Sequence, residues 1–392
     1  MVTAFVDMVG LLMVIPLVPF YVVELGGTGR VVGLLVASYS LAQLVSAPLW
    51  GRVSDRYGRR PALMIGLAFS ILAYTVFAFA NSIWLLLLSR MIQGAGGGTT
   101  GVIQAYVADT AEPENRARSL GWISAATNLG VAIGPVIGSL TYALGRPAPG
   151  LFAAGLCGLN LLFAARYLRE SRDFSDSPEP GVQLRSSREA LIGVVREGGD
   201  PASRLIWIYA SAMGAFQGVN AILGLFLAYR FGVTEKTIGY FFLYIGTLSV
   251  LTRALLLGPV VDRVGESRLW RLGVVAFSIG LAAIPFAQSY LSLALAVALI
   301  PLGTAFTFPC VTALLSRVVD RHERGLYMGV QQTYGGIARV IGPLWAGWAY
   351  EQLGVGVPFW TGGLVVFATL LFGIGMERAL ATGRTGLKPA AL

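Results

Sequence analysis

Two apolar stretches of the chain are separated by the short polar sequence GRVSDRYGRRP, residues 51–61. A related sequence, GPVVDRVG at residues 258–265, follows another apolar stretch 207 positions later. The two sequences share two glycines, a valine and an Asp-Arg pair at identical spacing. Glycine permits a tight turn and aspartate caps helix ends, whereas chance similarity between apolar helices would mostly match leucines. The sequence therefore predicts a duplicated unit.

A second pair of sequences supports the duplication. The same residue types recur at an offset of 208 in two sets: Arg116, Gly121, Gly134 and Pro135, then Arg324, Gly329, Gly342 and Pro343. Between the repeats, residues 169–203 combine proline, glycine and mixed charges, as a linker does. We therefore predict an amino-terminal bundle at 1–168, a cytoplasmic linker at 169–203 and a carboxy-terminal bundle with a short tail at 204–392.

The composition indicates that lipid surrounds most of the chain. Of 392 residues, 55% are hydrophobic and only 12% charged, about half the charge density of soluble domains. A bilayer is spanned by about 20 helical residues, and continuously apolar runs favour helices over a barrel. We predict an all-α membrane protein with twelve transmembrane helices in two pseudo-symmetric six-helix bundles. The expected spans are 3–22, 31–51, 61–80, 82–105, 118–143, 149–168, 204–229, 236–257, 270–288, 290–316, 324–350 and 356–377.

The net charge of +9 follows the predicted topology. Most of the 29 basic residues fall in the tails and in the connections of one parity. The connections of the other parity contain only Arg30, Arg146, Arg230 and Lys236. By the positive-inside rule, both termini and the linker should lie in the cytoplasm, in a multi-pass protein of the cell (inner or plasma) membrane. A nucleic-acid partner is not expected, and the apolar start lacks the features of a cleaved signal peptide.

Enzyme classes find little support in the sequence. Cys157 and Cys310 lie inside predicted spans and His322 is the single histidine, so no disulfide framework, metal site or catalytic triad is expected. The two lysines, Lys236 and Lys388, do not follow the glycine run of a phosphate-binding loop. We predict a protein that is not an enzyme and needs no cofactor.

The stretch at 51–61 resembles the signature loop between helices two and three of the major facilitator superfamily, at every defining position. Within that superfamily, the whole chain is similar to the proton-coupled drug exporters, which include the multidrug and tetracycline antiporters. The resemblance implies alternating access and a cytoplasmic latch that stabilises the outward-facing state; a purely topological basic loop is the alternative. The expected latch residues are Gly51, Asp55, Arg56, Gly58, Arg59 and Arg60, with ion pairs to Asp109 and involvement of Arg118.

The fifth predicted span contains glycines at intervals that resemble the antiporter motif of the same family. The motif residues are Gly121, Gly130, Gly134, Pro135 and Gly138. The chain departs from the usual pattern at Ser139, where glycine is common. Glycines and proline allow close helix approach and bending, so a role in packing alone is the alternative to a role in export.

Two charged residues in predicted spans are candidates for proton coupling. Arg90 lies in a segment, 88–94, that resembles the helix-four motif whose arginine the family assigns to this role. Asp7, with Gly10 and Pro16, resembles the first-helix motif of the drug exporters. A carboxyl that moves between water and an apolar environment can carry a proton, and an arginine within the bilayer should face water or a partner. The structural alternatives are an ion pair for Arg90 and a helix cap for Asp7.

Polar and aromatic residues near the middle of the spans are candidates for substrate binding, and each could instead join helices. The polar candidates are Tyr39, Gln43, Asn128, Gln217, Asn220, Tyr244, Gln331 and Gln332, and the aromatic candidates are Phe216, Phe306 and Phe308. Arg339, near mid-bilayer, has three possible partners: an anionic substrate group, Asp7 or backbone carbonyls.

These expectations combine into one predicted function. The protein should be a secondary active transporter, a monomer, that exports small hydrophobic or amphipathic molecules in exchange for protons. A proton-coupled or facilitative transporter of a metabolite or a lipid on the same fold is the alternative. A membrane receptor that binds without transport is a further alternative, from a different class of protein.

Overall fold

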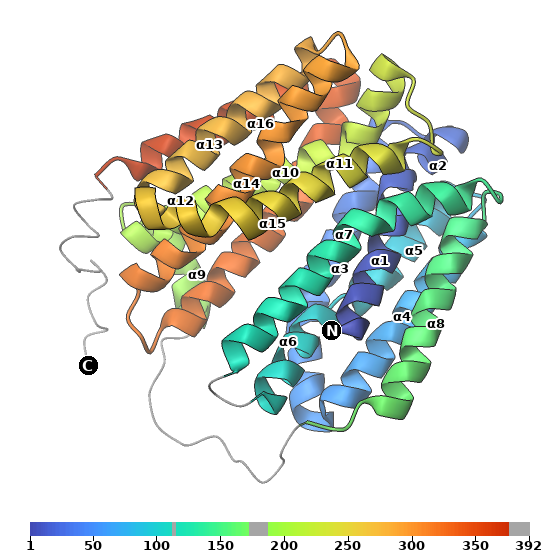
Figure 1. Cartoon of the computed structure of the whole chain (residues 1–392), viewed down its shortest axis with the longest axis horizontal. Helices are drawn as coiled ribbons and strands as arrows, with labels where there is room; N and C mark the ends of the chain where they lie inside the picture. Colours follow the sequence, from blue (N-terminus) through green and yellow to red (C-terminus); the bar gives the residue numbers. More distant parts are fainter. Residues whose placement is uncertain (112–114, 172–186, 376–392) are drawn as a thin grey trace. The chain divides into compact units, whose positions relative to one another are not determined.

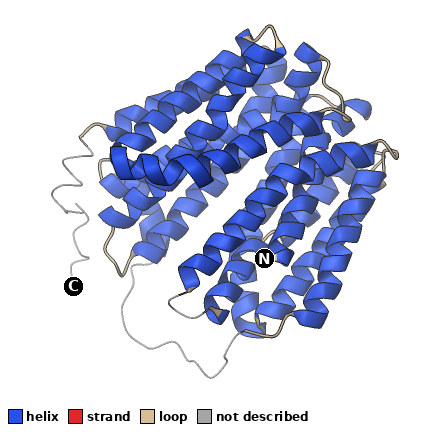
Figure 2. Cartoon of the chain, viewed as in Figure 1, coloured by secondary structure: helices blue, strands red, loops and turns tan. Residues whose placement is uncertain are grey.

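The computed structural model describes residues 1–111, 115–171 and 187–375, and these residues form helices joined by short connections (Figures 1 and 2). Within them, nine helical stretches are long and apolar enough to cross a membrane. Three further segments lie where the remaining expected spans were placed, so the structure is consistent with twelve passes: α5 (Ile83–Gly96) with α6 (Thr99–Thr110), α15 (Arg324–Gln352), and the shorter apolar stretch Val357–Gly373. The all-helical, multi-pass architecture expected from the composition is confirmed.

The helices group into two compact units. Unit 1 comprises Met1–Pro178 with Ala221–Thr247, and unit 2 comprises Glu179–Asn220 with Leu248–Leu392. Two helices are divided between them, because α10 (Pro201–Phe231) and α11 (Ile238–Leu251) each contribute to both units. Each unit is described separately below.

Unit 1 contains the first eight α-helices of the chain and one short 3₁₀ helix. They are α1 (Val2–Val14), η1 (Ile15–Leu17), α2 (Val18–Glu24), α3 (Gly29–Tyr57), α4 (Arg59–Ala78), α5, α6, α7 (Arg116–Tyr142) and α8 (Ala148–Tyr167). Pro16 and Pro19 interrupt the first span, because proline removes a helical hydrogen-bond donor. The expected span 82–105 is interrupted at Gly97 and Gly98, which end a glycine-rich run and separate α5 from α6.

The core of unit 1 is built by close helix pairs. Helix α1 packs against α7 and α8, and α4 packs against α5 and α8. The largest fully buried side chains in this unit include Tyr21, Tyr74 and Phe77, with the Tyr21 and Phe77 ring centroids 4.6 Å apart. These contacts give α1, α4 and α8 a common interior.

Unit 2 contains the remaining helices. They are α9 (Ser187–Arg196), the first part of α10, the end of α11, the π-helical η2 (Thr252–Leu256), α12 (Leu257–Val264), α13 (Glu266–Ala283), η3 (Ile284–Phe286), α14 (Tyr290–Val318), α15, α16 (Val357–Ala368) and η4 (Thr369–Gly373). Helix α13 packs against α14 and α16. A Cβ atom at Gly273 would lie 2.8 Å from the Gly303 carbonyl oxygen, so glycine permits this approach of α13 to α14.

The segment expected to be a linker includes a docked helix. The hydroxyl of Tyr334 in α15 donates to the Leu191 carbonyl in α9 over 2.9 Å. The indole of Trp207 in α10 donates to the Val194 carbonyl over 3.4 Å, and the Trp207 and Tyr334 rings meet edge to face. Two transmembrane helices therefore hold α9 in unit 2.

Candidate functional site

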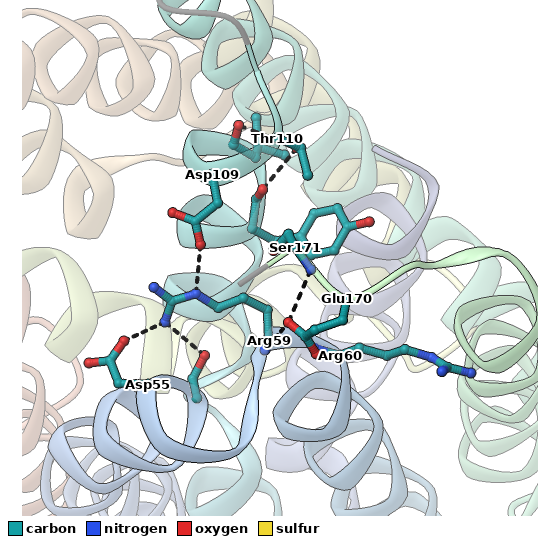
Figure 3. Close-up of polar contacts among 10 residues, drawn as sticks. Asp55, Arg59, Arg60, Asp109, Thr110, Glu170 and Ser171 are labelled. Atoms are coloured by element: carbon teal, nitrogen blue, oxygen red, sulfur yellow. Dashed lines mark hydrogen bonds and ion pairs between the residues drawn. The ribbon is translucent and has the colours of Figure 1, made fainter. Parts of the chain in front are cut away.

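The polar turn between α3 and α4 brings together charged residues from four segments of unit 1. Gly58 ends α3 with φ of +104°, a left-handed conformation that favours glycine, and α4 begins at the next residue. Figure 3 shows the side chains of Asp55, Arg59, Asp109 and Glu170 converging on this turn. The turn therefore places the first residue of α4 between carboxylates from other helices.

Arg59 is the centre of this cluster. Its Nε donates to Asp109 Oδ2 over 2.9 Å, which joins α4 to the end of α6 (Figure 3). Its Nη1 donates to Asp55 Oδ1 over 2.7 Å and to Ser54 Oγ over 3.0 Å, which joins α4 to the end of α3. One guanidinium thus connects three helices through charge-assisted hydrogen bonds.

Glu170, just beyond the end of α8, completes the cluster and was missed by the sequence prediction. Its carboxylate accepts hydrogen bonds from the backbone N–H groups of Arg59, over 2.8 Å, and Arg60, over 3.1 Å. Helix α4 begins with arginines and has no side-chain cap of its own, so Glu170 caps its amino terminus from the segment that follows α8. A Cβ atom on Gly58 would collide with the same carboxylate.

The other residues predicted for the latch lie differently. Arg60 donates to the Ala165 carbonyl in α8, whereas the Arg56 guanidinium lies over the Tyr57 ring, 5.3 Å from its centroid. A Cβ atom on Gly51 would have nothing within 4 Å, so no close approach requires glycine there. The side chain of Arg118 lies outside the described part of the chain.

Unit 2 contains a counterpart of the Arg59–Asp109 pair with the charges exchanged. Glu266, the first residue of α13, follows Gly265, whose φ is +79°. Its Oε1 accepts from Nη2 of Arg317, near the end of α14, over 2.8 Å. The two pairs occupy corresponding positions, because Glu266 lies 207 residues after Arg59, and Arg317 lies 208 residues after Asp109. Both halves therefore contain an ion pair between corresponding helices, with the acidic and the basic residue exchanged.

The glycines predicted as an antiporter motif line the contact between α7 and α1. Cβ atoms at Gly130 and Gly134 would each lie 2.9 Å from a carbonyl oxygen of α1, and one at Gly138 would collide with a third. The three carbonyls belong to Phe5, Val9 and Met13. Each set has a four-residue spacing, so one face of α7 lies directly against the backbone of α1. Gly121 has nothing within 4 Å of the position of a Cβ.

Ser139, the departure from the usual glycine pattern, contacts the start of α11. Its Oγ accepts a hydrogen bond from the Gly239 backbone N–H over 2.9 Å. Gly239 is in the first turn of α11, where backbone N–H groups lack helical partners. The Gly239 position also leaves no room for a side chain, since a Cβ would lie 2.7 Å from the Pro135 carbonyl oxygen. Ser139 therefore satisfies a donor that glycine would leave unbonded.

Asp7 lies in α1, opposite the beginning of α6. Its half-buried carboxylate accepts a hydrogen bond from the buried hydroxyl of Thr99 over 3.2 Å. Thr99 is the first residue after the Gly97–Gly98 interruption, so the break between α5 and α6 positions this hydroxyl. Among the described residues, Asp7 and Arg90 make no ion pair with each other.

Arg90 in α5 is buried among polar and aromatic groups. Its Nη2 donates to Ser89 Oγ over 3.2 Å, and its guanidinium lies 5.2 Å from the Phe77 ring centroid. Its Nε has no hydrogen-bond partner among the residues that the structure describes, although the side chain is only 3% exposed. One turn along, Gln93 donates to the Tyr74 hydroxyl over 2.6 Å. An arginine in such a setting is costly, which makes it a candidate functional residue.

The substrate candidates of unit 1 form local contacts. Gln43 donates to the Gly97 carbonyl, over 3.1 Å, and to the Tyr39 hydroxyl, over 3.4 Å, so this pair reaches the α5–α6 interruption. Asn128 donates to the Ser124 carbonyl of its own helix over 2.8 Å. The structure thus joins Tyr39 with Gln43, while Tyr244 is an exposed residue of α11.

The candidates of unit 2 separate into a clustered set and an internal set. Arg339 Nη2 donates to Gln332 Oε1 over 3.1 Å, and Gln332 Nε2 donates to the Tyr209 hydroxyl over 3.4 Å. The sequence prediction did not include Tyr209. Phe308 meets both Tyr209 and Phe216 edge to face, with centroids 5.3 and 6.3 Å apart.

The other candidates of unit 2 take no part in the hydrogen bonds and ring contacts of this cluster. Phe306 is 9% exposed and faces Gly273 of α13. Gln331 is fully buried and its Oε1 accepts from the Thr312 hydroxyl over 3.2 Å. Gln217 and Asn220 are half-buried. Among the described residues of the whole chain, no group of three or more His, Cys, Asp or Glu side chains could hold a metal ion.

Comparison with known proteins identifies a family for nearly the whole chain. The family model described as Major Facilitator Superfamily matches residues 1–256 and 205–389. The class C tetracycline resistance protein of Escherichia coli is 31% identical over 87% of this chain and 86% of its own. Multidrug resistance protein 2 of Bacillus subtilis is 25% identical over 93% and 91%. The crystal structure of peptide transporter POT in complex with sulfate covers 98% of this chain and 94% of its own, with a TM-score of 0.80 and 14% identity.

Proposed function

This chain belongs to the Major Facilitator Superfamily, and we propose that it exports hydrophobic or amphipathic small molecules in exchange for protons by alternating access. It is a multi-pass membrane transporter and not an enzyme. Relatives that are named tetracycline and multidrug resistance proteins support the export of drug-like molecules. In this proposal the bundles at 1–168 and 204–392 move against each other, with both termini in the cytoplasm of an inner-membrane protein.

The observation that carries the proposal is the hydrogen bond between Asp7 and Thr99. A proton carrier needs a carboxyl whose surroundings change during transport, since desolvation favours the neutral form and water favours the charged form. Asp7 bonds to a neutral hydroxyl and to no cation in the described chain, so either protonation state can be accommodated. Arg90, with its unbonded Nε, is proposed as the second coupling residue in the same unit.

The glycine contact of α7 with α1 supports the link between this carboxyl and a moving bundle. Asp7 lies between Phe5 and Val9, whose carbonyls meet Gly130 and Gly134. Because the two backbones are in direct contact, a displacement of α7 must displace the helix that holds Asp7. The Arg59 cluster is the proposed latch, which stabilises one of the two alternating states.

The proposal is tested by transport into proteoliposomes with an imposed pH gradient. The intact protein should accumulate tetracycline and the cationic dye ethidium when the lumen is more acidic, and a protonophore should abolish the accumulation. Asp7→Asn, which cannot exchange a proton at this position, should lose gradient-driven accumulation. Asp320→Asn makes the same chemical change at an exposed residue outside the helices and should behave as the intact protein.

Three outcomes would contradict the proposal in whole or in part. Failure of both compounds to move under either gradient direction would argue against drug export and favour a metabolite or lipid substrate. Gradient-independent movement of the compounds would favour a facilitator. Normal accumulation in Asp7→Asn, with the protein otherwise active, would exclude Asp7 as the proton carrier.

A further inference from the structure

Arg339 places a positive charge in the middle of a transmembrane helix of unit 2. It is the sixteenth residue of the 29-residue α15, hence about 22 Å along the axis from Arg324. A charge at this depth is expensive and usually has an acidic partner or faces water. The side chain is only partly buried, so part of the guanidinium is accessible to a ligand, while its buried Nε has no hydrogen-bond partner among the described residues.

The partners that Arg339 does have in the structure are neutral. Gln332 accepts a hydrogen bond from Arg339, and the Gln332 amide donates in turn to the Tyr209 hydroxyl. The acidic residues described in unit 2 lie in α9, in connections or within two residues of a helix end. They are Glu189, Glu197, Asp200, Asp262, Glu266, Asp320, Glu323 and Glu351. The described part of unit 2 therefore provides no counter-ion at the depth of Arg339.

An aromatic wall adjoins the charge. Gly335 allows the Tyr209 ring to reach α15, since a Cβ at this glycine would lie 2.7 Å from Tyr209 Cε1. The same Cβ would lie 3.7 Å from Arg339 Nη2, so ring and guanidinium are neighbours across one glycine. Phe308 and Phe216 extend the aromatic surface from Tyr209. Three helices, α10, α14 and α15, thus bring one uncompensated cation and three aromatic rings together within unit 2.

We propose that Arg339, Gln332, Tyr209, Phe308 and Phe216 form a binding site for amphipathic organic anions. The site would take a planar aromatic molecule that has a carboxylate, sulfonate or phenolate group. The acidic group accepts hydrogen bonds from Arg339, which gains the missing counter-ion, while the Gln332 amide offers a neutral polar contact. The rings of Tyr209, Phe308 and Phe216 contact the aromatic body. This inference rests on the proposed export function and adds amphipathic organic anions to the molecules that the transporter would carry.

The inference is tested with two dyes that share a xanthene ring system and differ in charge, fluorescein and rhodamine 123. Fluorescence anisotropy measures their binding to the purified full-length protein in nanodiscs. Fluorescein should bind at least tenfold more tightly than rhodamine 123. Arg339→Gln should weaken fluorescein by tenfold or more, the usual range for a hydrogen bond to a charged group, and leave rhodamine 123 within twofold.

Three further variants separate charge from packing. Arg339→Lys should recover part of the fluorescein affinity, because it restores the charge without the planar donor fork. Gly335→Ala, which presses on the Tyr209 ring, should weaken both dyes. Arg230→Gln removes an equal charge from an exposed residue at the end of α10 and should change neither dye. Because Arg339→Gln removes a charge that is costly in the membrane, this variant is expected to fold, which size-exclusion chromatography checks.

Equal binding of the two dyes, or fluorescein binding that is unchanged in Arg339→Gln, would overturn the anion site. The flux assay distinguishes this failure from failure of export. Gradient-driven accumulation of ethidium without recognition of fluorescein would refute the anion site and leave export intact. Selective, Arg339-dependent fluorescein binding without flux of any compound would support the site and refute the proposed function.

Discussion

Replacing Arg59 with glutamine should disconnect α4 from α3 and α6 and shift the protein's conformational equilibrium. The guanidinium makes ion pairs of 2.9 Å with Asp109 and 2.7 Å with Asp55, and glutamine can make neither. The Glu170 contact uses the backbone of Arg59 and should survive the substitution. The expected effect is therefore a loss of the side-chain connections while the start of α4 remains capped.

The magnitude follows from the exposure of the three side chains. The Arg59 side chain is 12% exposed, Asp109 34% and Asp55 57%. Exposed ion pairs contribute about 0.2 to 1 kcal/mol, and hydrogen bonds to charged groups in less exposed places contribute about 1.5 to 3 kcal/mol. We expect about 1 kcal/mol from the Asp109 pair and less from the Asp55 pair. A total of about 1 to 2 kcal/mol shifts an equilibrium about 5- to 30-fold.

Spin labels on the two halves, at the ends that contain the Arg59–Asp109 and Glu266–Arg317 pairs, report this equilibrium through the populations of their distance distribution. Arg59→Gln should shift the populations about 5- to 30-fold, Asp109→Asn by less, and the double variant by little more than Arg59→Gln alone. Arg56→Gln makes the same change in the same turn, where the guanidinium lies on Tyr57, and should leave the populations nearly unchanged. Equal shifts in Arg56→Gln and Arg59→Gln would refute the reasoning, since net charge and not the ion pairs would then control the equilibrium.

Three other predictions concern contacts of the same kind. Glu170→Ala should lower the free energy of unfolding by about 1 to 2 kcal/mol, measured by thermal unfolding of the purified protein, because α4 loses its cap, and Glu170→Gln should lower it by less. Equal stability of the intact protein and both variants would exclude a capping role. Gly138→Val should abolish transport because a side chain there collides with the Met13 carbonyl, whereas Gly121→Val should be tolerated in the same helix; equal losses would contradict close packing as the cause. In unit 2, Glu266→Arg should impair transport, and adding Arg317→Glu should restore part of it, because the amino half has a basic residue and an acidic residue at these corresponding positions. A double variant that transports no better than Glu266→Arg would contradict the correspondence.

Much of the fold follows from the sequence because its determinants are local or repeated. Apolar length predicts the passes, and the recurrence of residues 51–58 at 258–265 predicts two related halves. Glycine spacing in α7 predicts close packing, and the structure identifies α1 as the partner. The interruption at Gly97–Gly98 is less predictable, since a glycine run can either continue a membrane helix or break it.

The site depends on contacts between residues far apart in the chain, and these were not predictable. Glu170 contacts a residue 111 positions away, and Tyr209 contacts one 123 positions away. An acidic residue directly after the sixth span was the available signal for Glu170, and a tyrosine within the seventh span was the signal for Tyr209.

Helix rotation separates candidates that lie close together in the sequence. Phe306 and Phe308 are two residues apart, hence about 200° around α14, and only Phe308 reaches Tyr209. Gln332 and Arg339 are seven residues apart, which is nearly two full turns, so they share a face of α15. Periodicity alone relates these residues to one another but does not identify the neighbouring helix that each face meets.

The most direct test of proton exchange is the proton movement that accompanies substrate movement. Proteoliposomes are loaded with tetracycline and the pH-sensitive dye pyranine, without an imposed pH gradient, and diluted into medium that lacks tetracycline. Outward movement of tetracycline through the protein should drive protons inward and acidify the lumen, and Asp7→Asn should abolish the acidification while Asp320→Asn retains it. Tetracycline release at the normal rate without a change of luminal pH, or unchanged acidification in Asp7→Asn, would contradict the account.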